Sequence, residues 1–349
     1  MENLKVKWEA PIYPEPLQKG DYIGITATSS GVQGVFLKRL DNSIKQLRDL
    51  GYECIETPSV RNNYKLTSGS SEVRAKEFLS LYRDERVKLI IPPWGGELLM
   101  DMLPHIDFEE IKNLPPKWVM GFSDTSTLLF TLAVKCNIAT AHGPNAMDFG
   151  TTPIDESVLN ALNLLSSSGE IKQSNLQYFQ KDWPDIEGNE IRPYNLSEKV
   201  QWKLLNSGES CSFQGRLIGG NLDVICKLIG TPFAPVEAFI NNYKEDGFIW
   251  YFESCNMDST DIYRTLWQMN LNGWFINCRG FIFGRAEGYE DAGDFNFVDS
   301  LMYPLADLKV PIIYDADLGH LPPQLTFING ALASVRYESG KCSIFQQLI

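Results

Sequence analysis

The sequence lacks basic clusters and long hydrophobic runs, and it is poor in histidine. Among its 349 residues there are 3 histidines, and no more than two Lys or Arg residues are adjacent. No segment approaches the ~18 consecutive apolar residues of a membrane-spanning helix. The chain has 31 Lys and Arg residues but 44 Asp and Glu residues, so its net charge is −13. A protein that binds the phosphates of a nucleic acid needs a cluster of basic residues on its surface. We therefore expect no nucleic-acid and no membrane partner.

Cysteine pairs are also missing. The 7 cysteines are scattered along the chain and none forms a C-x-x-C pair, so we expect reduced thiols rather than a disulfide framework or a zinc site. The N-terminal segment has no apolar stretch of signal-peptide length and no cleavage signature. These absences together predict a cytoplasmic protein.

The first part of the chain alternates apolar strands with amphipathic helices. One such helix is predicted between Phe36 and Gly51, with Leu40, Ile44 and Leu47 on one face and the glycine as its end. The strands are continuous apolar runs, which is typical of parallel sheets covered on both faces. The pattern predicts an N-terminal α/β domain with a parallel sheet at residues 1–165.

The rest of the chain has a different character. Residues 166–212 are polar, rich in Trp and Asn and weakly periodic, and we interpret them as a linker and irregular segment. Residues 213–349 mix apolar strands, helices and a closing hairpin-like stretch at 331–348. The predicted fold class is α/β, with a C-terminal β-rich α+β domain as the second unit.

The segment Gly121–Asp124 (GFSD) joins a predicted strand to a predicted helix through a tight turn. A nucleophile elbow has this context: the turn lifts the Ser123 hydroxyl clear of the sheet, and the Asp124 N–H at the helix start can face an oxyanion. The alternative is that Ser123 or Asp124 merely caps the helix.

A serine nucleophile needs a base and a group that orients the base. His105 lies at a predicted helix start, where a surface or capping role is usual, whereas His142 and His320 follow strands and could each face a cleft. Spacing alone does not choose between these two. Glu253 closes an apolar run and would be costly to bury without a partner; the alternative is a carboxylate that emerges into water.

Two adjacent glycines, Gly95 and Gly96, follow another predicted strand in PPWGGE. Adjacent glycines let backbone N–H groups approach a ligand, so either residue could supply a second oxyanion donor. A plain turn or a phosphate-cradling loop would look similar. The chain shows no G-x-G-x-x-G or Walker lysine here, which argues against nucleotide-driven chemistry.

These motifs resemble the LD-carboxypeptidase family of serine peptidases, which includes murein tetrapeptide carboxypeptidases and microcin C self-immunity peptidases. The resemblance runs from Gly20 to Ala331 through VKLIIPPWGGELLMDMLPHIDFEEIKNLPPKWVMGFSDTSTLL, AHGPN, GRLIGGNL, ESCN, GFIFGR and LGHLPPQLTFINGA. It implies a catalytic triad of Ser123, Glu253 and His320. It also implies oxyanion donors at Asp124 and the Gly95–Gly96 pair, an active site in the cleft between the two domains, and a homodimer.

The resemblance predicts hydrolysis of a peptide or amide bond near a free carboxylate, as in a murein tetrapeptide, with no metal and no cofactor. The long Trp-bearing segment before Gly215 resembles the microcin-immunity branch, so peptidyl or aminoacyl nucleotides are an alternative substrate. A non-catalytic peptide or small-molecule sensor is a second alternative.

Four residues are candidates for substrate binding. Trp183 or Trp202 would stack on a base if the substrate is a nucleotide, and Glu287 could receive a free amino group. Arg285 could bind the free carboxylate of the substrate; the alternative is that it is an ordinary ion-paired residue.

Overall fold

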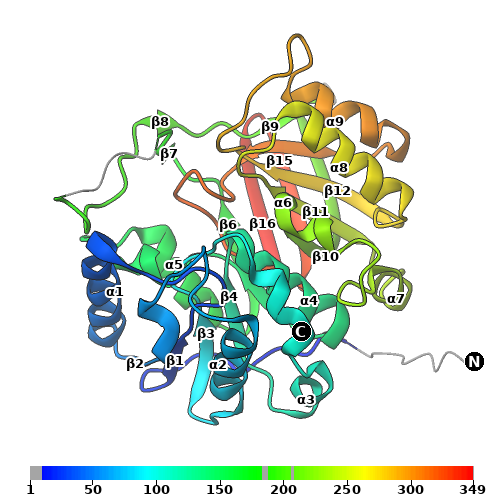
Figure 1. Ribbon diagram of the computed structural model, residues 1–349. Helices are drawn as coiled ribbons and strands as arrows, with labels where there is room; N and C mark the ends of the chain where they lie inside the picture. Colours follow the sequence, from blue (N-terminus) through cyan, green and yellow to red (C-terminus); the bar gives the residue numbers. More distant parts are fainter. Residues whose placement is uncertain (1–9, 183–187, 206–207, 349) are drawn as a thin grey trace, which may run out of the picture.

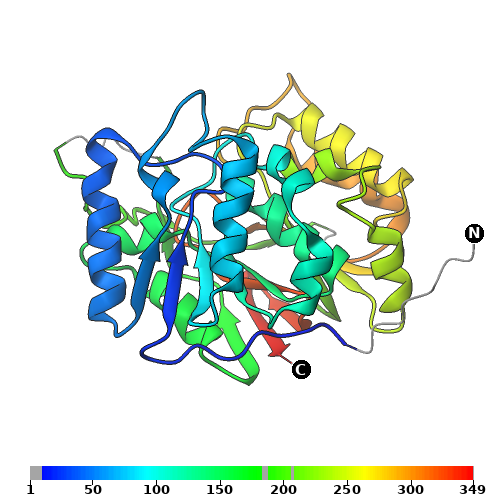
Figure 2. The same ribbon diagram turned by 60° about the horizontal axis from the view of Figure 1, so that its bottom comes forward.

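Two β-sheets with helices packed on them make up the molecule (Figures 1 and 2). The computed structural model describes residues 10–182, 188–205 and 208–348. Within these ranges no helix combines the length and the apolar character needed to cross a membrane.

The first sheet has six strands in the order β14-β5-β4-β3-β1-β2, of which β1 to β5 are mutually parallel. Its strands are β1 (Tyr22–Ile25), β2 (Glu53–Glu56), β3 (Val87–Ile91), β4 (Trp118–Gly121), β5 (Thr140–His142) and β14 (Phe327–Asn329). The parallel N-terminal sheet that the apolar runs predict is confirmed.

Helices connect these strands and cover both faces of the sheet. They are α1 (Leu37–Asp49), α2 (Ser71–Arg83), α3 (Phe108–Asn113), α4 (Ser126–Cys136) and α5 (Glu156–Leu165), with 3-10 turns η1 (Gly34–Phe36), η2 (Pro58–Arg61), η3 (Leu99–His105), η4 (Ser123–Thr125) and η5 (Ala146–Gly150). The apolar faces of α1 and α5 pack on one side of the sheet, and α2 and α4 on the other. Helix α2 begins where the Ser70 hydroxyl accepts a hydrogen bond from the Val73 N–H, the usual serine N-cap.

The second sheet has eight strands in the order β6-β16-β15-β10-β11-β12-β13-β9. They are β6 (Gly169–Ser174), β9 (Lys203–Leu204), β10 (Ser210–Asn221), β11 (Phe248–Glu253), β12 (Cys278–Gly284), β13 (Ile312–Ala316), β15 (Leu332–Glu338) and β16 (Lys341–Leu348). Strands β10 to β13 run parallel, and the others pair antiparallel with their neighbours. The predicted closing hairpin is formed by β15 and β16.

Helices α6 (Leu222–Ile225), α7 (Val236–Asn242), α8 (Ser259–Leu271) and α9 (Phe297–Leu305) and the 3-10 turns η6 (Cys226–Leu228) and η7 (Ala306–Leu308) belong to this second half. A small pair, β7 (Tyr178–Phe179) and β8 (Glu198–Lys199), lies apart from both sheets (Figure 1). Helix α4 is buried along almost its whole length between the two halves, which explains why its sequence is apolar on all sides.

The segment predicted as linker and irregular contains sheet strands. Strand β6 pairs antiparallel with β16, and β9 pairs with β13. The reason is that β6 is an edge strand whose alternate side chains are exposed, so its sequence carries little apolar signal. Strand β14, from the C-terminal part of the chain, pairs with β5 and completes the first sheet. The first sheet therefore contains strands from both halves of the chain.

Candidate active site

Ser123 occupies a strained turn directly after β4. Its backbone φ is +62°, in the left-handed region that residues other than glycine rarely adopt. The turn runs through η4 into α4, so the strand, sharp turn and helix of a nucleophile elbow are all present. The Ser123 side chain is half-buried, which leaves its hydroxyl partly accessible.

Ser123, His320 and Glu253 form one hydrogen-bonded chain. Ser123 Oγ lies 3.0 Å from His320 Nε2, and His320 Nδ1 lies 2.7 Å from Glu253 Oε2. Glu253 is the last residue of β11 and is 2% exposed, and His320 follows β13. The three residues meet at the carboxyl ends of parallel strands, where α/β folds place their ligand sites.

The Glu253–His320 pair shifts the pKa of both groups. Burial disfavours the imidazolium, but the Glu253 carboxylate outweighs it and raises the pKa of His320 well above its ordinary 6.5. Burial likewise disfavours the Glu253 carboxylate, yet the charge and hydrogen bond of His320 lower the pKa of Glu253 below 4.5. The pair is thus arranged to hold an imidazolium against a carboxylate.

Gly319 allows the His320 loop to pass over Glu253. Its φ is +97°, and a Cβ built there would lie 2.6 Å from Glu253 Cβ and 2.7 Å from Glu253 Oε2. A side chain at this position would therefore push the histidine away from its carboxylate partner.

The Gly95 backbone lies against the Ser123 side chain. A Cβ on Gly95 would lie 2.6 Å from Ser123 Oγ and 3.0 Å from the Asp124 nitrogen. A Cβ on Gly96 would instead meet Ser29 and Ser30 on the loop after β1. Of the two glycines, Gly95 is the one that borders the hydroxyl.

The Asp124 side chain is buried away from the Ser123 hydroxyl and has its own partners. Its carboxylate accepts hydrogen bonds from Ser29 Oγ at 2.6 Å and from the Leu99 N–H at 2.8 Å. Burial raises the pKa of Asp124 to about 6. The side chain thus holds the Ser123 turn in contact with two neighbouring loops. This structural role is separate from the role expected for the Asp124 backbone N–H.

A side chain at Gly95 should lower activity, because it would displace the backbone next to the Ser123 hydroxyl and the Asp124 nitrogen. Gly95→Val should lower kcat by about 10²–10³-fold, the loss typical of one oxyanion donor, because its Cβ collides with Ser123. Gly69→Ala is the matched control, since a Cβ there meets Val73 at an ordinary 3.4 Å. Steady-state kinetics of both variants check this, and full activity of Gly95→Val would remove the glycine from the site.

The other two histidines lie outside the hydrogen-bonded chain. His142 is fully buried, with Nδ1 at 3.4 Å from Ser126 Oγ, and burial lowers its pKa to about 4. It packs behind the site as a neutral ring. His105 lies at the surface, 3.7 Å from Glu72.

Arg285 does not present a free guanidinium to a substrate, which corrects the prediction that it receives a carboxylate. It is 6% exposed, and its Nη1 donates to Asp317 Oδ1 at 2.8 Å and to the Asp315 carbonyl at 3.1 Å. Asp317 is itself fully buried, three residues before His320. The ion pair supports the loop that carries the histidine.

The prediction for Trp202 is also wrong. Its ring is fully buried in the core of the second sheet, and its Nε1 donates to Asp317 Oδ2 at 3.0 Å, so it cannot stack on a substrate. Trp183, the other candidate, lies outside the described residues.

Arg285→Ala should destabilise the protein without changing what it recognises. The variant leaves the Asp317 carboxylate buried and without its cation, which typically costs about 3–5 kcal/mol. We expect a lower Tm and an equal loss of kcat/KM on a free-carboxylate substrate and its amide. Arg264→Ala, with a side chain 71% exposed, is the control. A loss confined to the carboxylate substrate would contradict this assignment.

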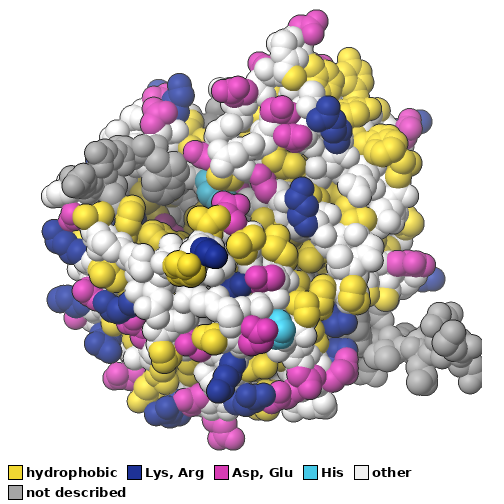
Figure 3. All heavy atoms as spheres, viewed as in Figure 1, with side chains coloured by type: hydrophobic (Ala, Val, Ile, Leu, Met, Phe, Trp, Pro, Cys, Tyr) yellow, Lys and Arg dark blue, Asp and Glu magenta, His cyan; other side chains and the backbone are white. Residues whose placement is uncertain are grey.

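Glu287 belongs to an acidic group around Cys255, a neighbour of His320, that the sequence did not reveal. Its Oε2 accepts a hydrogen bond from Cys255 Sγ at 3.0 Å, and the Cys255 N–H donates to Asp223 Oδ2 at 3.0 Å. Burial raises the pKa of Asp223 to about 7. Burial also raises the pKa of Cys255, although a hydrogen bond with His320 opposes this. In Figure 3, acidic side chains lie beside a histidine in the hollow between the two halves.

A serine on a strained turn, hydrogen-bonded through an imidazole to a buried carboxylate, is the arrangement of a serine hydrolase. The chain belongs to the LD-carboxypeptidase family, peptidase S66: the model of the N-terminal domain matches residues 23–143 and that of the C-terminal domain matches residues 214–335. It is accordingly a serine peptidase, a carboxypeptidase-type hydrolase.

Relatives of this family match along nearly the whole chain. A Vibrio cholerae protein named as a carboxypeptidase is 28% identical over 94% of this chain and 96% of its own. The microcin C7 self-immunity protein MccF of Escherichia coli is 26% identical over 97% of both chains. A Bacillus subtilis protein named as a murein peptide carboxypeptidase is 23% identical over 92% of this chain and 91% of its own.

Solved structures show the same fold. MccF in complex with glutamyl sulfamoyl guanosine superposes with a TM-score of 0.82 at 24% identity, covering 96% of this chain and 98% of MccF. The muramoyltetrapeptide carboxypeptidase of Oxalobacter formigenes gives 0.72 at 21% identity, covering 93% and 98%. The predicted two-domain α/β architecture is confirmed.

Proposed function

We propose that Ser123, His320 and Glu253 are the catalytic triad of an amide hydrolase. The observation that supports this most strongly is the unbroken pair of hydrogen bonds, 3.0 Å and 2.7 Å, from Ser123 through His320 to Glu253. The φ of +62° at Ser123 supports it as well, because strain at this position is a feature of nucleophile elbows.

In the reaction, His320 Nε2 takes the hydroxyl proton as Ser123 Oγ attacks the carbonyl carbon of the substrate. The oxyanion accepts hydrogen bonds from the N–H groups of Asp124 and of Gly95 or Gly96. His320 then returns the proton to the departing nitrogen, and the C–N bond breaks. Water attacks the acyl-serine with the same help from His320 and regenerates Ser123, while Glu253 holds the imidazole in one tautomer throughout.

The substrate we propose is a small peptide, cleaved near a free carboxylate as in a murein tetrapeptide. Relatives named as murein peptide carboxypeptidases support this choice. Glu287 and Asp223 would attract a free amino group on the substrate, since both accept hydrogen bonds from Cys255, which itself interacts with His320.

An aminoacyl or peptidyl nucleotide is the second candidate. It is favoured by the likeness to MccF, which is seen with glutamyl sulfamoyl guanosine and with aspartyl sulfamoyl adenosine. Stacking of a base on Trp183 remains part of this proposal. We also expect a cytoplasmic homodimer, which analytical ultracentrifugation and cell fractionation would check.

Two measurements test these proposals. A fluorophosphonate probe should label the wild-type chain and not Ser123→Ala; absence of labelling in the wild type would favour a non-catalytic sensor. Turnover of a murein tetrapeptide and of an aminoacyl sulfamoyl adenylate, measured separately, then identifies the substrate class.

A further inference from the structure

The loop that follows β2 contains a strained turn at Lys65 and Leu66. Tyr64 and Thr67 pair across this turn: the Tyr64 N–H donates to the Thr67 carbonyl at 2.8 Å, and the Thr67 N–H donates to the Tyr64 carbonyl at 3.2 Å. The two central residues, Lys65 and Leu66, have φ of +52° and +68°. Asn and Gly normally fill such positions, because a Cβ is strained in the left-handed region. Backbone strain of this kind is typical of ligand sites.

The side chains around this turn are large, apolar and exposed. Tyr64 is 74% exposed and Leu66 is 59% exposed, and Leu98, on the loop after β3, is 36% exposed. We call these three residues the apolar rim. Figure 3 shows hydrophobic side chains along the border that the N-terminal half gives to the hollow with the histidine. Single exposed apolar residues are ordinary, whereas a group of them marks a contact surface.

A short chain of hydrogen bonds joins the turn to the proposed nucleophile. The Ser30 hydroxyl donates to the Leu66 carbonyl at 2.7 Å, and the Ser30 N–H donates to the Gly95 carbonyl at 3.3 Å. Gly95 borders the nucleophile, because a Cβ built on it would lie 2.6 Å from Ser123 Oγ. A peptide extends by ~3.3–3.6 Å per residue, so a substrate of a few residues reaches from Ser123 to the turn.

The third rim residue is held by the neighbouring serine. The Leu98 N–H donates to Ser29 Oγ at 3.3 Å, and the Ser29 hydroxyl donates to the Asp124 carboxylate at 2.6 Å. Asp124 supplies the other N–H that we assign to the oxyanion. Both rim loops are therefore fixed to the residues that surround the substrate carbonyl.

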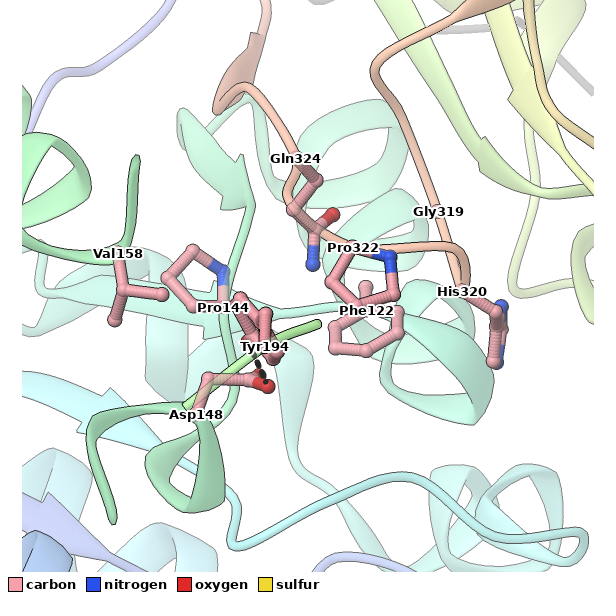
Figure 4. Close-up of a pocket in the computed structure, with 9 residues that line it drawn as sticks. All are labelled: Phe122, Pro144, Asp148, Val158, Tyr194, Gly319, His320, Pro322 and Gln324. Carbon is pink, nitrogen blue, oxygen red and sulfur yellow. Dashed lines mark hydrogen bonds between the residues drawn. The ribbon is translucent and has the colours of Figure 1, made fainter. Parts of the chain in front are cut away.

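The space between His320 and Phe122 is too small for a large side chain (Figure 4). Phe122, Pro144 and Pro322 fill much of it, and the pocket that remains holds about 10 Å³, room for about one water molecule. His320 returns its proton to the leaving nitrogen, so the released residue begins beside this histidine. Selection of a large substrate side chain is therefore expected from the acyl portion, on the other side of the scissile bond.

We propose that the apolar rim binds an apolar side chain in the acyl portion of the substrate, with Leu66 as a specificity-determining residue. The inference rests on the proposed triad and narrows the proposed substrate to peptides with a hydrophobic residue upstream of the one whose carbonyl is attacked. The upstream position follows from the separation of the rim from Ser123 by Ser30 and Gly95. Burial of Leu66 against this residue would offset the cost of the strained turn.

Two glycine substitutions in the turn separate the side chain from the strain. Leu66→Gly and Lys65→Gly each place glycine at a left-handed position, so each relieves strain and neither should lower Tm. Only Leu66→Gly removes a side chain of the apolar rim. Lys65→Gly is therefore the matched control for backbone strain and flexibility.

The substrates are peptides that share the released residue and carry leucine or asparagine, two side chains of similar size, at one upstream position. We expect the wild type to prefer leucine at the position that contacts the rim. In Leu66→Gly the ratio of kcat/KM for the leucine peptide to kcat/KM for the asparagine peptide should fall about 5- to 30-fold, because part of a buried apolar contact is lost. Lys65→Gly should leave this ratio unchanged.

Two results would overturn the role of the rim. One is an unchanged ratio in Leu66→Gly at every upstream position of the acyl portion. The other is an equal fall of the ratio in Lys65→Gly, which would assign the effect to the backbone of the turn.

Binding of the same peptides to Ser123→Ala, measured by calorimetry, tests the rim without turnover. Tighter binding of the leucine peptide, reduced by adding Leu66→Gly, would support the rim even if the wild type hydrolysed no peptide and did not react with a fluorophosphonate. That combination would contradict the proposed function alone. Equal binding of the two peptides would overturn the rim alone, so the two failures are distinguishable.

Discussion

Replacing Ser123 and His320 together by alanine should cost little more activity than replacing either one alone. Each single variant should lose roughly 10⁴-fold or more in kcat, because the hydroxyl is a poor nucleophile without the base and the base has no role without the hydroxyl. The 3.0 Å contact between Oγ and Nε2 is the physical basis of this expectation.

Single-turnover and steady-state kinetics of the two single variants and the double variant measure the effect. His105→Ala is the histidine control, since His105 lies at the surface and pairs only loosely with Glu72. If the loss in the double variant equalled the product of the single losses, Ser123 and His320 would act independently and the proposed triad would fail.

The local part of the site could be predicted because it is encoded within a few residues. An apolar strand, a Gly-x-Ser turn and an apolar helix predict the elbow at Ser123, and the structure adds only the φ of +62°. The choice of His320 over His142 could not be made from spacing. Both are expected just after strands, and only the assembled fold shows that His320 meets Ser123 whereas His142, the last residue of β5, is fully buried.

Arg285 and Trp202 show why substrate contacts were harder to predict. A lone arginine and a tryptophan in a polar segment look like ligand groups, yet both bind Asp317, which is 32 residues from the first and 115 from the second. Nothing local marks Asp317 as their common partner.

The strands, like the site residues, include some that the sequence predicts and some that it does not. Strands β1, β3, β4 and β5 follow from hydrophobic runs and helix spacing, since nearly all of their residues are buried. The edge strand β6 and the three-residue strand β14 depend on pairing with distant segments, at β16 and β5. Their sequences are too polar or too short to reveal this.

Glu253→Gln should lower kcat by about 10⁴-fold with the fold intact, the size of effect known when the carboxylate of a serine-protease triad becomes an amide. The amide can present its NH₂ to His320 Nδ1 and so favour the wrong tautomer, and it cannot stabilise the imidazolium. The pH profile of the residual activity separates these effects from simple misfolding.

The direction of the pH shift follows from the pKa of His320. The Glu253 carboxylate raises this pKa above 6.5, and the base form of the imidazole exists only above it, so wild-type kcat/KM should rise with pH through a midpoint above 6.5. In Glu253→Gln the carboxylate is gone while the burial remains, so the pKa of His320 falls and the acid limb should move to lower pH at a reduced plateau. Asp223→Asn is the matched control: it also removes a carboxyl group near His320, but one bonded to the Cys255 N–H. A smaller shift in that variant would assign the effect to the 2.7 Å contact, whereas an unmoved acid limb in Glu253→Gln would mean that Glu253 does not govern the histidine.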